Sequence, residues 1–144
     1  GYYTFVMEAN NGTATIYDTV NFLNRGGTPI ASLPPYGEEG IHAINDSTMY
    51  FQLRAPFKDF IYLIGDFNDW KFLPNYELNK TPAGDYFWIE ITGLDKTKEY
   101  GFQYMIDEEQ MRVTDPYVQK VLDPWNDQYI SSSVYPNLKP YPTG

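Results

Sequence analysis

The chain has 144 residues, no cysteine, 42% hydrophobic and 18% aromatic residues, and a formal net charge of -9. This length and hydrophobic content suit one domain with a substantial core and argue against disorder. The acidic charge argues against binding to nucleic acid or to an anionic membrane surface, and the absence of thiols excludes a disulfide framework.

The first predicted element is a β-hairpin. Residues 2–8 and 13–20 alternate approximately between apolar and polar side chains. Asn10-Asn11-Gly12 between them is a strong turn signal. The hairpin is either part of the main domain or the last hairpin of a preceding module, and we slightly favour the second interpretation.

Turn-forming residues then predict a boundary. Residues 25–29 (RGGTP) and 33–37 (LPPYG) carry the glycines and prolines that are typical of linkers. We therefore assign residues 1–36 to an N-terminal hairpin and linker, and we start the next domain at residue 37.

Residues 37–130 are predicted to form a β-sandwich. Met49, Phe51 and Leu53 alternate with other side chains, which predicts a half-buried strand. Residues 60–64 are apolar throughout, which is typical of a central strand covered on both faces, and this longest apolar run is far too short to span a bilayer.

The same alternation predicts strands at 86–91 and 100–106, with Trp88 on the outer face of the first, and a further short strand at 111–114. Strands at this spacing, separated by Gly, Pro, Asn and Asp, indicate a sandwich. The best helical candidate is residues 117–122, where two apolar pairs lie four residues apart.

The C-terminal residues 131–144 are predicted to be an extended, irregular tail. They include Pro136, Pro140 and Pro142, which disfavour regular structure. Because the chain also starts at Gly1 without Met, we expect a piece of a longer protein, so that a missing targeting signal says nothing about the parent.

The acidic side chains do not predict catalysis, because a glycosidase needs two carboxyl groups at a defined separation across a cleft. Asp66 and Asp69 lie in a turn where Asp and Asn side chains cap their own backbone, and residues 107–109 look like a hairpin tip. His42 has no second histidine or cysteine to share a metal. We expect no catalytic residue, metal or cofactor in this chain.

Aromatic side chains are better candidates for a binding site, because sugars present C–H faces that stack on Trp or Tyr rings. Trp70 follows the acidic turn and is the first candidate; the alternative is that it seals the end of the sandwich. Trp88 lies beside Tyr86 on an outward face, and the alternative for Trp88 is cover by a neighbouring module.

Three segments together resemble a known family. They are residues 61–70 (IYLIGDFNDW), 85–94 (DYFWIEITGL) and 100–107 (YGFQYMID). Over residues 41–130 the chain resembles the immunoglobulin-like (E-set) module that precedes the barrel of glycogen-branching enzymes, isoamylases and other α-amylase-superfamily proteins. That module is also similar to the glycogen-binding domain of the AMP-activated kinase β subunit. The resemblance implies an all-β, immunoglobulin-like β-sandwich.

The resemblance also implies a sugar site. Glycogen-binding relatives stack a glucan on the Trp that Trp70 matches. They carry a second Trp and a Lys where this chain has Arg112 (or Met111) and Gln103. The candidate α-glucan contacts are therefore Trp70, Asn68 and Arg112, with one stacking platform kept and the second Trp and the Lys missing.

Residues 121–129 and 135–139 are similar to the connection between this module and the (β/α)8 barrel in bacterial polysaccharide-utilising proteins of the α-amylase family. This implies that Tyr117, Trp125 and Tyr129 dock on a downstream catalytic domain of the same chain. The alternative is that Trp125 caps the core of its own domain.

We therefore expect a non-catalytic accessory module of a bacterial α-glucan-acting glycoside hydrolase that supports or orients the barrel and secondarily contacts starch or glycogen. Residues 131–144 are the expected linker toward the barrel. The alternative is a genuine starch- or glycogen-binding module that uses Trp70, and an interaction domain of a kinase-like regulator is a weaker third. The family resemblance implies a secreted, periplasmic or cell-surface location, and neither nucleic acid nor membrane insertion is expected.

Overall fold

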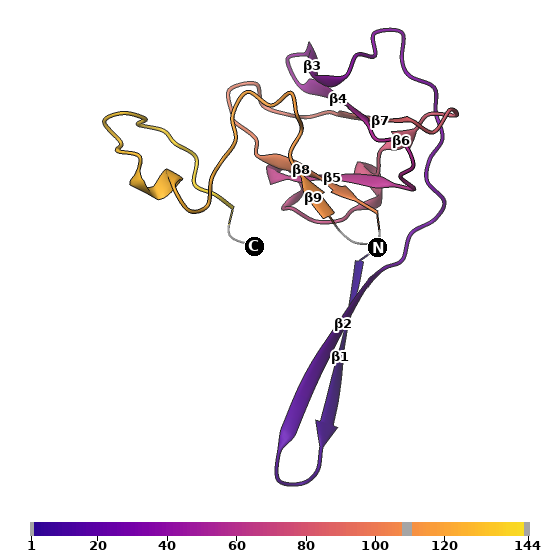
Figure 1. Cartoon of the computed structure of the whole chain (residues 1–144), viewed down its shortest axis with the longest axis vertical. Coiled ribbons are helices and arrows are strands. Elements are labelled where there is room, and N and C mark those ends of the chain that lie inside the picture. Colours follow the sequence, from indigo (N-terminus) through magenta and orange to yellow (C-terminus); the bar gives the residue numbers. More distant parts are fainter. Residues whose placement is uncertain (1, 108–110, 143–144) are drawn as a thin grey trace.

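Nine strands and three short 3₁₀ helices form the secondary structure of residues 2–107 and 111–142, which are the residues that this computed structural model describes (Figure 1). All strand pairs within the sheets are antiparallel, so the predicted all-β class is confirmed. The strands are β1 (Tyr2–Asn10), β2 (Thr15–Leu23), β3 (Gly40–Asn45), β4 (Thr48–Arg54), β5 (Ile61–Gly65), β6 (Asn79–Lys80), β7 (Tyr86–Ile91), β8 (Phe102–Ile106) and β9 (Met111–Val113). The 3₁₀ helices are η1 (Asp66–Asn68), η2 (Pro74–Tyr76) and η3 (Asp127–Tyr129).

Two sheets pack on each other around the main apolar core. Their strand orders are β3-β4-β7-β6 and β5-β8-β9. Phe87, Ile89 and Ile91 point inward from β7, as their alternation predicts, and meet Ile61 and Leu63 of the opposite sheet. Burial of each such side chain contributes about 1.5–3 kcal/mol, so this shared core holds the two sheets together.

Strand β5 is buried on both faces, as its unbroken apolar sequence predicts. Its inner face belongs to the main core, and its outer face belongs to a second apolar cluster. This cluster consists of Phe60, Tyr62, Ile64 and Met105, with Trp70 and Phe72 packed against it. The residues that follow η1 therefore cover a sheet face that would otherwise meet water.

The predicted central position of β5 is wrong, because this strand forms the edge of its sheet. The chain after η2 closes that edge: the N–H of Leu78 donates to the carbonyl of Ile61 at 2.8 Å, and Tyr62 forms a single bridge with Glu77. An unbroken apolar run shows that both faces are covered, but it does not show which strands supply the hydrogen bonds.

Strand β4 is more buried than the predicted half-buried strand. Its outward side chains Tyr50 and Gln52 are also buried, and they are hydrogen-bonded to each other at 2.6 Å. The turn at residues 34–37 covers them, and a Cβ on Gly37 would lie 2.9 Å from the Tyr50 hydroxyl. A side chain at this position would press on Tyr50 and on the Pro34 carbonyl oxygen, 3.1 Å from the same Cβ, so the close turn favours glycine.

The segment predicted as a linker is attached to the sandwich. Arg25 forms an ion pair with Glu77 at 3.1 Å, and its guanidinium lies 3.8 Å from the centre of the Phe60 ring. Further on, the N–H of Lys80 donates to the Pro29 carbonyl, and the N–H of Ala31 donates to the Lys80 carbonyl. These bonds extend the sheet beyond β6. The division of the chain at residue 36 stays a prediction.

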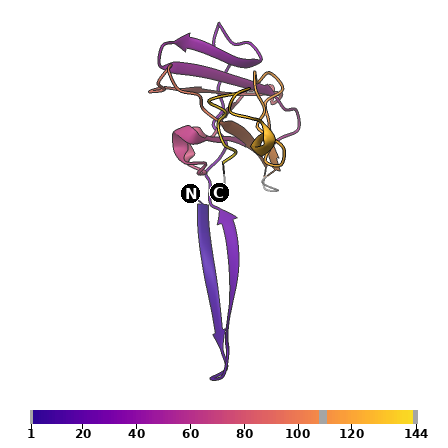
Figure 2. The same cartoon turned by 90° about the vertical axis from the view of Figure 1, so that its left-hand side faces the viewer.

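The hairpin β1–β2 extends away from the packed sheets (Figures 1 and 2). Its register places apolar side chains on one face, and the Phe22 ring stacks on Tyr3 and Phe5 with centroids 5.5 and 5.1 Å apart. This face remains exposed; its large members are Tyr3, Phe5, Met7, Ile16, Val20 and Phe22. Assignment of the hairpin to a preceding module stays a prediction.

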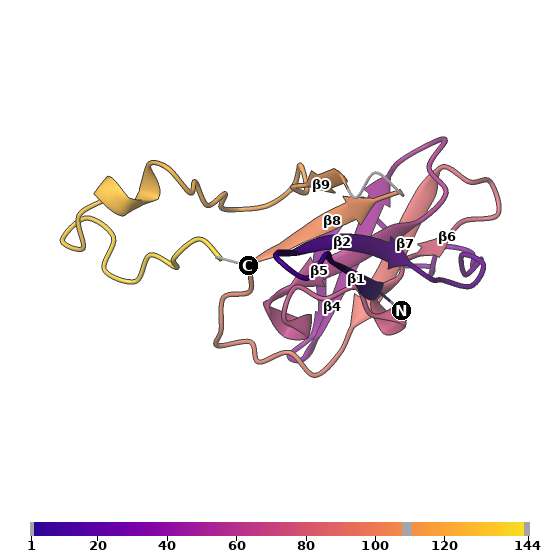
Figure 3. The same cartoon turned by 90° about the horizontal axis from the view of Figure 1, so that it is seen from below.

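The predicted tail, residues 131–144, is irregular over its described part, as its prolines predict. From here on the tail means all described residues after β9, 114–142, and Figure 3 shows it running out beyond β9 and turning back toward the sheets. The helix predicted at 117–122 is wrong, because these residues form turns and extended chain. Asp-Pro pairs at 115 and 123 bracket the segment, and two apolar pairs contribute too little to offset helix nucleation in six residues. Within the described ranges, no helix is long and apolar enough to cross a membrane.

We expect deletion of residues 1–22 to leave the midpoint of thermal unfolding unchanged, because no described side chain of this segment belongs to either core cluster. Leu63→Ala is the matched opposite case, since it opens a cavity in the main core and should lower the free energy of unfolding by about 2–5 kcal/mol. Circular dichroism during heating and urea unfolding measures both. If the deletion lowers stability as much as Leu63→Ala does, the conclusion that the hairpin lies outside the core is contradicted.

Candidate functional site

A tight turn at the end of β5 positions Trp70. Asn68 holds this turn: its Oδ1 accepts from the Gly65 N–H at 2.9 Å and its Nδ2 donates to the Leu63 carbonyl at 3.0 Å. Trp70 donates its own N–H to Gly65, and its φ of 59° lies in the left-handed region. A bulky residue is costly in that conformation, so the hydrogen bonds of the turn impose it.

Gly65 allows this turn to lie against the chain that enters β8. A Cβ at position 65 would lie 2.5 Å from the Gly101 carbonyl oxygen, closer than side-chain carbons approach such atoms. Asp66 donates its N–H to the same carbonyl at 3.0 Å. This close contact therefore fixes the position of Asp66 and Trp70 relative to the sheet.

The Asp66 carboxylate connects three separate parts of the chain. It accepts from the Trp70 indole Nε1 at 3.2 Å, from the Gly101 N–H at 2.5 Å and from the Lys139 ammonium at 2.7 Å. Partial burial raises the pKa of this carboxyl, but the hydrogen bonds from Lys139, Gly101 and Trp70 outweigh burial, so the pKa lies below its ordinary value. The expectation that Asp66 caps its own turn is wrong, whereas for Asn68 it is confirmed.

A groove of about 900 Å³ lies beside Trp70, between the β8–β9 part of the sheet and the C-terminal tail. Gln103 of β8 and Arg112 of β9 line its sheet side, while Tyr135 and Tyr141 line its tail side. Such a combination of aromatic rings and hydrogen-bonding groups suits a ligand with both apolar faces and hydroxyl groups.

Two lysines hold the tail in place. Lys120 pairs with Glu99 at 2.5 Å and lies 5.0 Å from the centre of the Tyr135 ring, and the hydrogen bond to Glu99 raises the pKa of this lysine. Lys139 pairs with Asp66 and also donates to the Glu99 carbonyl at 3.2 Å. Polar contacts therefore fix the position of a segment that has no regular secondary structure.

The structure separates the three predicted sugar contacts. Trp70 and Arg112 both line the groove, although they lie 42 residues apart in the sequence. Asn68 is buried, and both of its polar groups are occupied within the turn, so it positions Trp70 and lies below the surface. Gln103, which the resemblance matches to a Lys, lines the same groove.

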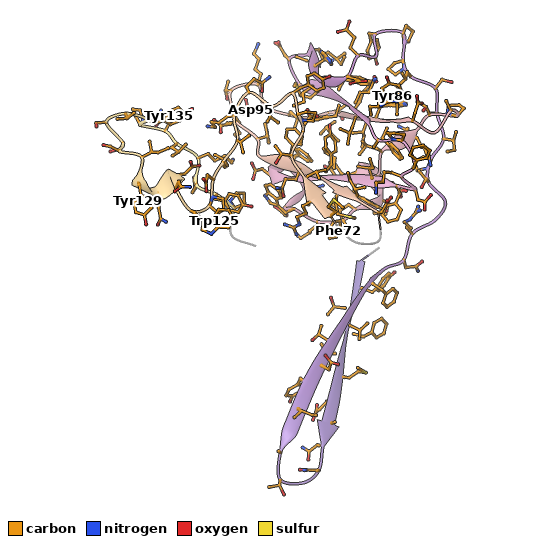
Figure 4. The ribbon with its side chains drawn as sticks, in the orientation of Figure 1. Phe72, Tyr86, Asp95, Trp125, Tyr129 and Tyr135 are labelled. Atoms are coloured by element: carbon orange, nitrogen blue, oxygen red, sulfur yellow. The ribbon has the colours of Figure 1, made fainter. Side chains whose placement is uncertain are left out.

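The three predicted docking residues lie outside the groove lining. Trp125 and Tyr129 are 75% and 80% exposed, and Figure 4 shows both on the tail, away from the packed sheets. The alternative that Trp125 caps its own core is therefore wrong. Tyr117 is 54% exposed, but its ring lies where a Cβ on Gly40 would come within 3.0 Å of it.

Trp88 points outward from β7, as its alternation predicts, but a segment of the same chain covers it. Its indole Nε1 donates to the Ala31 carbonyl at 3.3 Å, and its ring lies 6.0 Å from that of Tyr50. A neighbouring module is thus not required to explain its partial burial.

Other polar side chains, among them the candidate His42, have structural partners. Asp115 is 1% exposed and accepts from the Tyr104 hydroxyl and the Tyr117 N–H, both at 2.7 Å. His42 contacts the Glu39 carbonyl at 3.0 Å. Residues 108 and 109 of the predicted hairpin tip lie outside the described residues. In the part of the chain that is described, no three His, Cys, Asp or Glu side chains gather as metal ligands.

The sequence does not predict the tail side of the groove. Tyr135, Tyr141 and Lys139 were assigned only to a linker, because the prolines around them predict an extended segment and say nothing about where it lies. The available signal was the spacing of two tyrosines around a lysine in an extended, Pro-rich stretch.

Comparison with known proteins does not add to this assignment. No protein-family model and no curated protein matches the chain.

Substitution of Asp66 by Asn tests the connecting role of its carboxylate. The folded-state pKa lies below the ordinary 3.8, so the ionised form stabilises the fold above that pH, and this contribution is lost as the pH falls through the folded pKa. At pH 6 we expect Asp66→Asn to lower the free energy of unfolding by about 1–3 kcal/mol, a difference that shrinks in acid. Urea unfolding across pH measures it.

Asp69→Asn is the matched control, because this carboxylate is 81% exposed and, within the described residues, forms its ion pair with Lys71, which is itself 65% exposed. It should not change stability measurably at either pH. Equal effects of the two substitutions at all pH values would contradict the connecting role of Asp66.

Proposed function

We propose that this chain is an immunoglobulin-like (E-set) sandwich that serves as a non-catalytic accessory module of a bacterial α-glucan-acting glycoside hydrolase. Strand order supports the fold, since β3-β4-β7-β6 over β5-β8-β9 follows the A-B-E-D and C-F-G sheets of immunoglobulin constant domains. Tyr100 adds support: it lies just before β8, and its hydroxyl accepts from the Asp95 N–H at 3.0 Å, much like the tyrosine corner of such domains.

The exposed aromatic residues of the tail are the single observation that carries this proposal. Trp125 and Tyr129 expose most of their surface although large aromatic rings gain much from burial. They lie around η3, where backbone hydrogen bonds such as that from Ile130 to Asp127 give the segment a defined shape. We propose that they dock on a downstream (β/α)8 barrel of the same chain, with residues 131–144 as the linker, in a secreted, periplasmic or cell-surface enzyme.

Binding of an α-glucan is the second candidate function, and the groove beside Trp70 favours it. The Trp70 indole is held by Asp66, so the ring is oriented before a ligand arrives, which lowers the entropic cost of stacking. Gln103 and Arg112 lie on the same wall and offer donors and an acceptor to sugar hydroxyls. With one Trp on the sheet, we expect a dissociation constant of about 1 mM for a short glucan.

Docking is tested in the parent chain that carries the barrel. We expect Trp125→Ser combined with Tyr129→Ser to lower the midpoint of barrel unfolding, because the two rings lose their buried contacts in the assembled protein. Phe57→Ser is the control, since this side chain is 97% exposed but belongs to the sandwich. Differential scanning calorimetry measures the midpoints. An unchanged midpoint of barrel unfolding in the double variant would count against docking.

Sugar binding is tested by titration with maltoheptaose, followed by tryptophan fluorescence. We expect saturation at millimolar ligand for the wild type and for Trp125→Ala, because Trp125 does not line the groove. Trp70→Ala should lose the binding, because it removes the stacking platform of the sheet. A flat wild-type response up to tens of millimolar ligand would exclude the second function.

A further inference from the structure

The groove beside Trp70 has two walls that come from distant parts of the sequence. One wall belongs to the sheet and carries Trp70 and Arg112. The other belongs to the tail segment 135–142, which we name the strap, and carries Tyr135 and Tyr141. The two tyrosines are 41% and 40% exposed, so each ring keeps a large free surface.

The strap is held against the Trp70 wall at one point. Lys139 reaches Asp66 at 2.7 Å, and the other oxygen of this carboxylate holds the Trp70 indole. Gly101 lies beneath both: a Cβ there would meet Trp70 Cζ2 at 3.5 Å and Lys139 Cε at 3.7 Å. The lysine stem and the indole edge thus converge on one glycine, and one carboxylate orients both walls.

A second contact holds the far end of the strap. Lys120 bridges Glu99 and the Tyr135 hydroxyl, with the latter contact at 3.3 Å, and its ammonium lies near the Tyr135 ring. The position of this tyrosine is therefore determined by the folded domain and not by the strap alone.

The charges around the groove leave little net charge for a ligand to balance. Lys120 is paired with Glu99 and Lys139 with Asp66, so two of the cations near the groove are neutralised by their own partners. Arg112 and Asp69 are the further charged residues of the lining, and they have opposite signs. A neutral ligand that offers apolar faces and hydroxyl groups fits these walls better than an anion does.

We propose that the strap supplies the second aromatic wall of the sugar site, so that an α-glucan chain binds between Trp70 on the sheet and Tyr135 and Tyr141 on the strap. The inference rests on the proposed sugar-binding function and deepens it. The strap tyrosines take the stacking role of the second Trp that the sheet lacks at Arg112. The Lys139–Asp66 pair holds the strap in the position that binding requires.

The test is calorimetric titration of the whole chain with maltoheptaose. We expect Tyr135→Ala combined with Tyr141→Ala to weaken binding about tenfold, because two stacking rings are lost. Tyr129→Ala is the matched control, since it removes an 80% exposed tail tyrosine that does not line the groove, and it should bind as the wild type does. Thermal unfolding of each variant verifies that the sandwich is intact.

Lys139→Met separates the strap position from the rings themselves, because it keeps the stem and removes only the charge. We expect this variant to bind maltoheptaose several-fold more weakly, with an affinity that does not change when salt is added. The affinity of the wild type should fall with added salt, because salt screens the Lys139–Asp66 pair. Lys139→Arg should restore both the affinity and the salt dependence.

The outcomes distinguish the inference from the function on which it rests. If Trp70→Ala loses binding while the double tyrosine variant binds as the wild type does, the strap is not a wall and the inference is overturned, but the sugar-binding function stands. If the wild type gives no heat up to tens of millimolar ligand, both are overturned. If the double variant and Trp70→Ala weaken binding while Tyr129→Ala does not, the inference is supported.

Discussion

The Asp66 carboxylate is the interaction on which the arrangement of this surface depends. It lies at the end of β5 and binds the start of β8, the indole of Trp70 and the ammonium of Lys139. Each bond involves a charged acceptor, and such bonds are stronger than neutral ones. One side chain therefore fixes the turn, the ring and the returning tail relative to the sheet.

The sandwich itself depends on apolar cover of more than its central core. The outer face of β5 and β8 is buried under Trp70 and Phe72, and the outer face of β4 lies under the turn at 34–37. Irregular segments thus act as additional layers over both sheets. This explains how short strands form a well-buried domain, because β5 and most of β4 are buried on both faces.

Two parts of the chain leave apolar surface outside this arrangement. The β1–β2 hairpin exposes one apolar face at one end of the molecule, and the tail exposes Trp125 and Tyr129 at another (Figures 1 and 4). Extended apolar surface of this kind marks contact sites in soluble proteins. This arrangement fits the proposed role of a module that contacts other protein domains through its ends and binds a sugar chain between them.

Local patterns in the sequence determined most of the strands, the inward face of β7, the two-sided burial of β5 and the turn before Trp70, because alternation and turn chemistry act over a few residues. They did not predict β3 and β6. Only the tertiary structure decided that β5 forms an edge, that Asn68 is buried beneath Trp70 and that the strap lines the groove. Those outcomes depend on contacts such as Lys139–Asp66, between residues 73 positions apart. No short-range pattern encodes such a pair, because loop closure over that distance is determined by the packing of the whole domain.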